Sequence, residues 1–108
     1  MRSYRPRLRP GWYSYKAQNG SRCWVRLLWV VPNPGASNAG DWWVTFASPI
    51  TDTHSGWCWE ELWVSEFTRS MRRGNPPARI KGLLYRSVMW RQYRYSQWEV
   101  ARARRAAS

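Results

Sequence analysis

A short turn between two alternating runs is the feature that most constrains the fold. Asn19–Gly20 is a strong β-hairpin dipeptide. Residues 11–16 before it and 21–31 behind it alternate with the period of two expected of strands. In the longer run, one face would carry Trp24, Leu28 and Val30, and the other Cys23, Val25, Leu27, Trp29 and Val31. Both faces of this strand are therefore expected to be at least partly covered.

Loops rich in Pro and Gly mark out the rest of a β-rich region. Residues 32–41 and 49–56 have loop composition and bracket a third strand over residues 42–47. Residues 57–67 fit a short strand or turn, followed by either a helical turn or a further strand. The β-rich region, residues 11–67, resembles SH3-like and Tudor-like barrels in size and strand spacing. The resemblance implies a small barrel, and no binding residue is carried over from those families.

A connector and a helix are expected to complete the single domain. Residues 68–79 contain Gly74 and Pro76–Pro77, which end whatever precedes them. Residues 80–105 contain no Pro and predict one basic, aromatic helix that is apolar on two sides. One stripe would hold Ile80, Leu84, Val88, Tyr95 and Trp98, and the second Tyr85, Met89, Tyr93 and Val100. A homodimer would cover the second stripe, since a chain of 108 residues has one core. The expected fold class is α+β, a small antiparallel sheet or SH3-like barrel with a C-terminal helix.

Charge is concentrated in three blocks. Residues 1–31 carry seven basic side chains and no acid, and residues 32–68 carry five acids and neither Lys nor Arg. Residues 69–108 carry eleven basic side chains against Glu99 alone, and the net charge is +12. Concentrated like charge needs a partner or internal neutralisation, because self-repulsion opposes compaction. The sequence therefore points to a polyanionic partner, a nucleic acid or a nucleoprotein complex.

The basic segments have the composition of a nucleic-acid surface. Residues 1–10 form a basic arm expected to be flexible, and in residues 72–105 Arg alternates with Trp and Tyr, whose rings stack unpaired bases. Nothing encodes base readout, so RNA or single-stranded DNA would be bound largely without sequence preference. The alternative is a solvated basic helix whose rings fill the core. The expected phosphate contacts are Arg5, Arg7, Arg9, Arg72, Arg73, Arg86, Arg91, Arg94, Arg102, Arg104 and Arg105.

The acidic centre is rich in Trp, which suits a protein interface. The anchors for a protein partner would be Trp42, Trp43, Trp57, Trp59 and Trp63. In scale, the chain is similar to anti-defence proteins of phages and mobile elements, anti-CRISPR proteins among them. The second functional prediction is thus an inhibitor that acts on a host protein or nucleoprotein. The alternative is that these acids only neutralise the basic helix of the same molecule.

Catalysis, metal binding and membrane insertion have little support in the sequence. Asp52, His54 and Ser55 are neighbours on one loop and do not line up as a triad. A non-enzyme is expected, with a small basic ribonuclease similar to RelE-like toxins as the enzymatic alternative. Neither metal nor cofactor is expected, because the only imidazole or thiol ligands are His54, Cys23 and Cys58. Both cysteines are expected as buried free thiols.

The sequence has no signal-peptide pattern and no apolar run long enough to cross a bilayer, so a cytoplasmic protein is expected.

Overall fold

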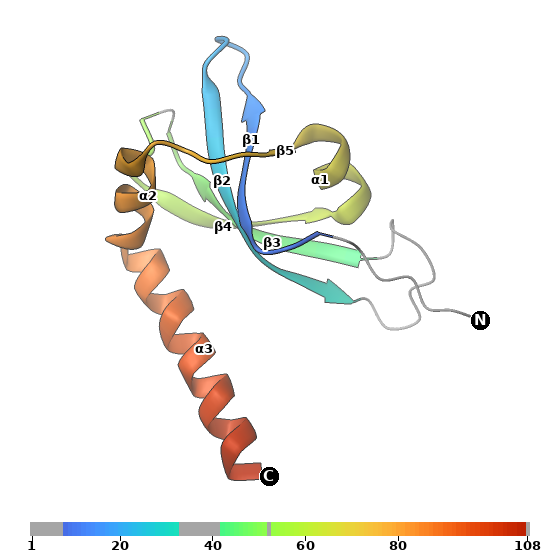
Figure 1. Cartoon of the computed structure of the whole chain (residues 1–108), viewed down its shortest axis with the longest axis vertical. Helices are drawn as coiled ribbons and strands as arrows, with labels where there is room; N and C mark the ends of the chain where they lie inside the picture. Colours follow the sequence, from blue (N-terminus) through green and yellow to red (C-terminus); the bar gives the residue numbers. More distant parts are fainter. Residues whose placement is uncertain (1–7, 33–41, 52, 108) are drawn as a thin grey trace, which may run out of the picture.

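Five strands form one antiparallel sheet in the computed structural model, which describes residues 8–32, 42–51 and 53–107. The strands are β1 (Gly11–Lys16), β2 (Arg22–Pro32), β3 (Trp42–Pro49), β4 (Trp57–Trp63) and β5 (Arg72–Arg73). Their order is β4-β3-β2-β1-β5, and the sheet stays open with β4 and β5 at its edges (Figure 1). The α+β class with a small antiparallel sheet is confirmed, whereas the barrel that residues 11–67 resemble is not formed.

The first two strands form the predicted hairpin. The Gly20 N–H donates to the Ala17 carbonyl at 2.9 Å, and Gly20 takes the left-handed conformation with φ 86°. The side chain of Asn19 braces the same turn, because its Oδ1 accepts from the Ser21 N–H at 2.9 Å. The register that follows places Lys16 directly opposite Arg22.

An inserted residue in β2 changes the faces predicted for that strand. Leu27 and Trp29 pair with adjacent residues of β3, so Leu28 forms a β-bulge between them. Beyond the bulge, Trp29 lies on the same face as Leu28, and Val30 packs on the opposite face. The predicted alternation is therefore wrong for Trp29 and Val30, because one extra residue inverts a pattern whose period is two.

Between β4 and α2 the chain crosses from one face of the sheet to the other. Helix α1 (Val64–Ser70) packs against one face, β5 then runs along β1, and helix α2 (Ala78–Tyr85) covers the opposite face (Figure 1). The Gly74 N–H donates to the Trp12 carbonyl at 3.1 Å, which ties this crossing to the sheet. The connector predicted over residues 68–79 is therefore partly regular structure.

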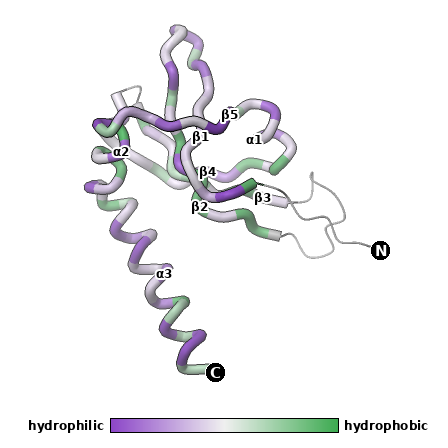
Figure 2. Tube along the Cα trace, in the orientation of Figure 1, coloured by the Kyte–Doolittle hydropathy of each residue, from purple (hydrophilic) through white to green (hydrophobic). Residues whose placement is uncertain are grey.

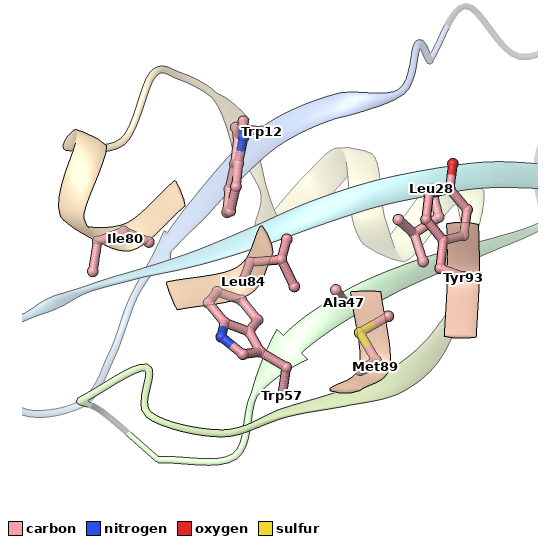
Figure 3. Close-up of a cluster of buried hydrophobic side chains, with 8 residues drawn as sticks. All are labelled: Trp12, Leu28, Ala47, Trp57, Ile80, Leu84, Met89 and Tyr93. Atoms are coloured by element: carbon pink, nitrogen blue, oxygen red, sulfur yellow. The ribbon is translucent and has the colours of Figure 1, made fainter. Parts of the chain in front are cut away.

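Both faces of the sheet carry a hydrophobic core. The cluster under α2 and the start of α3 holds Trp12, Leu28, Ala47, Trp57, Ile80, Leu84, Met89 and Tyr93 (Figure 3). The cluster under α1 holds Tyr13, Val25, Leu27, Val44, Phe46, Val64 and Phe67. The expectation that both faces of the second strand are covered is confirmed.

The prediction of a single helix over residues 80–105 is wrong. The helical conformation is interrupted after α2, and a second helix, α3 (Val88–Ala107), follows. The Ser87 hydroxyl donates to the Leu84 carbonyl at 2.6 Å and accepts from the Trp90 N–H at 3.1 Å. Ser87 thus ends one helix and caps the next.

The break also changes which helical residues are buried. Met89 and Tyr93 pack on the sheet, whereas Val88, Tyr95 and Trp98 are exposed. The predicted stripes are therefore wrong, and the homodimer prediction loses Met89 and Tyr93 from the surface on which it depended.

Candidate nucleic-acid interface

The second half of α3 contributes no buried residue to the core. Tyr93 is the last buried residue of the helix, and residues 94–107 are all exposed. In Figure 1 this part of α3 extends away from the sheet, and Figure 2 shows hydrophilic residues recurring along it. Its side chains contribute little to the core and are available to a partner.

Cations and rings share the outer side of this helix. At 100° per residue, six positions fall within an arc of about 100° opposite Met89 and Tyr93, over a length of about 21 Å. They are Arg91, Arg94, Tyr95, Trp98, Arg102 and Arg105, all exposed, and we call them the outer stripe. Its four Arg are all among the predicted phosphate contacts, and the helix brings them to one side.

The two rings of the outer stripe lie beside one another. The centroids of Tyr95 and Trp98 are 5.9 Å apart, and the Arg102 guanidinium lies 5.5 Å from the Trp98 centroid. Trp98 is 50% exposed. Glu99 accepts a hydrogen bond from the Tyr95 hydroxyl, and this bond raises the pKa of Tyr95 above its usual value. The stripe thus offers two neighbouring exposed rings, with the guanidinium of Arg102 over one of them.

The other predicted phosphate contacts lie elsewhere. Arg5 and Arg7 lie outside the described residues. The Arg9 side chain is exposed, but its carbonyl accepts from the Tyr13 hydroxyl at 3.0 Å, so this end of the arm is bound to the sheet. Arg72 and Arg73 are on β5, Arg86 follows α2, and Arg104 faces a groove between α3 and the sheet.

A second group of cations surrounds a hollow of about 640 Å³ between the β1–β2 hairpin and the end of α1. We call it the basic hollow, and its cations are Lys16, Arg22, Arg69 and Arg72. Only Arg72 is among the predicted site residues. The Asn19–Gly20 turn is a usable signal for Lys16 and Arg22, since a hairpin places residues on either side of its turn opposite one another. Arg69 has no such signal, because the sequence leaves α1 undecided.

The five predicted Trp anchors differ in exposure. Trp57 is a core residue, 7% exposed, and does not reach the surface, whereas Trp59 is 38% exposed and lies 5.5 Å from Trp29 between centroids. Trp43 and Trp63 are cross-strand partners that stack at 3.7 Å. Trp42 packs against the cluster under α1.

A groove of about 630 Å³ runs between α3 and Trp29. Its other lining residues are Ser96, Gln97, Val100, Ala101 and Arg104. Trp29 and Trp59 are each a little over a third exposed. The Trp29 ring stacks on Tyr93, and the Trp59 ring meets Tyr93 edge to face.

Of the residues considered for catalysis or metal binding, Asp52 lies outside the described residues, and His54 has a structural contact. His54 is 4% exposed, and its Nε2 accepts from the Trp24 N–H at 3.1 Å. Both thiols are free: Cys23 is buried, and burial together with Glu60 raises the pKa of half-buried Cys58. Across residues 8–32, 42–51 and 53–107, no three His, Cys, Asp or Glu side chains lie close enough together to hold a metal.

No helix in the described part of the chain has the length and apolar character needed to span a bilayer. Comparison with models of protein families, with curated proteins and with solved structures finds no match to this chain.

Proposed function

We propose that this protein is a non-enzymatic module that binds single-stranded nucleic acid, RNA or DNA, through the outer stripe of α3. One observation carries the proposal: four Arg and two rings share one exposed side of a helix that projects beyond the sheet. The fold does not require this arrangement, since Tyr95 and Trp98 lie outside both core clusters.

The chemistry of the stripe suits an unpaired strand. Arg neutralises phosphate and releases counterions, and a base stacks on an aromatic ring with about 1–3 kcal/mol. Rings and cations have no preference among the four bases, so binding is expected to be largely independent of sequence.

Fluorescence anisotropy with labelled single-stranded RNA and DNA of mixed sequence tests the proposal. Affinity is expected to fall steeply with salt, and a duplex of the same length is expected to bind less well because its bases cannot stack on Trp98. Failure of both single strands to bind at physiological salt would remove the proposal.

A second candidate is a protein-interaction inhibitor of the anti-defence type, which acts on a host protein or nucleoprotein. The observation that favours it is the groove lined by Trp29, because Trp29 and the neighbouring Trp59 are both more than a third exposed. Exposed Trp is enriched at the centre of protein interfaces. Purification from a host lysate with and without nuclease separates the two: a partner that survives nuclease and high salt favours the inhibitor, and a partner lost with nucleic acid favours the first proposal.

A further inference from the structure

The basic hollow concentrates positive charge that none of its described lining residues balances. Lys16 and Arg22 face one another directly across the hairpin, an arrangement that destabilises an antiparallel pair when the charges are alike. Arg72 lies opposite Ser14 on the other side of β1, and Arg69 adds a fourth cation from α1. Among the described residues that line the hollow there is neither Asp nor Glu. The four cations repel each other unless an anion lies between them.

One of these cations is held in place by the wall of the hollow. Arg22 Nη1 donates to Ser14 Oγ at 3.0 Å, and Ser14 is 3% exposed. The Ser14 hydroxyl accepts this bond and still has its own proton to donate. A guanidinium fixed before the ligand arrives loses less conformational entropy when it binds.

The size and charge of the hollow indicate the class of ligand. A volume of about 640 Å³ is that of a small-molecule site. A phosphodiester brings one negative charge, whereas linked phosphoryl groups bring several into the same volume, which suits a hollow lined by four cations. We propose that the basic hollow binds a polyphosphate, a chain of two or three phosphoryl units. The polyphosphate belongs either to a free nucleotide or inorganic salt, or to the triphosphorylated end of an RNA strand.

This site is separate from the outer stripe. The hairpin and α1 lie at the opposite end of the molecule from the free end of α3 (Figure 1), and none of the four cations belongs to α3. The polyphosphate proposal therefore goes beyond the proposed function and does not depend on it. Trp98→Ala is expected to leave polyphosphate binding unchanged, which makes failure of one proposal distinguishable from failure of the other.

Isothermal titration with inorganic triphosphate, at constant ionic strength and without divalent metal, tests the site. We expect saturable binding of one equivalent, weakened roughly tenfold in Arg22→Gln and in Arg69→Gln, because each variant removes one charge-assisted hydrogen bond. Arg79→Gln is the matched control: it removes an exposed Arg of α2 outside the hollow and should leave affinity unchanged. Arg69 is exposed on α1, so its variant tests the hollow even if Arg22→Gln disturbs the hairpin.

Two results would overturn the proposal: no saturable binding of triphosphate, or an equal loss of affinity in Arg79→Gln and Arg69→Gln. Two RNA oligonucleotides of one sequence, with a 5′-triphosphate or a 5′-hydroxyl, identify the source. Tighter binding of the triphosphorylated strand that disappears in Arg69→Gln supports an RNA end. Equal binding of the two strands, with inorganic triphosphate still bound, supports a free polyphosphate.

Discussion

The backbone N–H of Trp24 donates a hydrogen bond to Nε2 of His54 at 3.1 Å. The two residues are thirty positions apart, and the bond fixes the loop before β4 against the middle of the sheet. His54 is buried and has a positive φ of 60°, a conformation that needs support from its surroundings. The only histidine of the chain therefore satisfies a main-chain group of β2.

His54→Ala is expected to lower the free energy of unfolding by about 1–3 kcal/mol, because it leaves the Trp24 N–H without its acceptor. Urea denaturation measures the change. Ser55→Ala, an exposed neighbour on the same loop, is the control and should stay within about 0.5 kcal/mol of the parent. Equal stabilities of the His54 variant and the parent would mean that this bond contributes nothing. RNA cleavage that His54→Ala abolishes would support the ribonuclease alternative.

Trp98→Ala is expected to weaken binding of a single strand by about 1–3 kcal/mol, the contribution of one stacked base. Its effect on stability should stay within about 0.5 kcal/mol, since Trp98 is half exposed. Val88→Ala truncates an exposed apolar residue outside the outer stripe and is the matched control for anisotropy. Equal affinities of the Trp98 and Val88 variants would contradict the stacking role.

Replacing the Arg of the outer stripe by Gln, one at a time, should flatten the salt dependence of binding. Each substitution removes one contact between an Arg and a phosphate. It is therefore expected to reduce the slope of log K against log salt by about 0.7 on a single strand. Arg91, Arg94, Arg102 and Arg105 should behave alike. Affinity measured at several salt concentrations gives the slope, and Arg79→Gln is again the control. A slope that is unchanged in every one of these variants would place the phosphates elsewhere.

Ser87→Ala is expected to cost about 0.5–2 kcal/mol of stability, because the N-cap of α3 loses its side-chain acceptor. The matched control is Ser96→Ala, an exposed serine inside the same helix. Thermal unfolding followed by circular dichroism compares them. A smaller loss at Ser87 than at Ser96 would show that the break between α2 and α3 does not depend on this cap.

Stability is expected to fall at alkaline pH through Tyr93. Burial raises the pKa of its hydroxyl, outweighing Arg26, Arg94 and the hydrogen bond from Gln97. The unfolded chain releases this proton near pH ~10 and the folded chain only above that value. The contribution is therefore complete below about pH 10 and is lost as pH rises toward and through the folded pKa. Urea titrations from about pH 8 to 11 should show a shallower alkaline fall for Tyr93→Phe, and parallel curves would contradict this assignment.

The parts of the fold that the sequence predicts are those with local signals. The turn at Asn19–Gly20 marks the hairpin, and loop residues on both sides mark β3. The bulge at Leu28 has no such signal, because β2 is apolar on both faces and either alternation would fit. The break at Ser87 is equally hard to predict, since no Gly or Pro interrupts the helix there. A serine before an apolar run is an N-cap signal, but the same residue is common inside helices.

The candidate site is predictable in its residue types and less so in its arrangement. Arg91, Arg94, Arg102 and Arg105 follow helical spacing, so their common side is implicit in the sequence. Which side of α3 faces the sheet depends on the break at Ser87. As a result, Tyr93, which was expected on the stripe away from the core, is buried, and Tyr95, which was expected against the sheet, is exposed. The basic hollow depends on β5 and α1 meeting the hairpin, an association of distant segments that local patterns do not encode.

The position of β5 has a consequence for how the chain is made. β1 acquires β2 as soon as residue 32 has emerged from the ribosome, but its other neighbour arrives only with residues 72 and 73. At about 5–20 residues per second, roughly 3–11 s separate the end of β1 from β5. During that interval β1, which contains Trp12 and Tyr13, is an unpaired edge strand. Such an edge can pair with other chains. The two Arg of β5 therefore do more than extend the sheet: they close the edge of β1 at Tyr13 and Ser14.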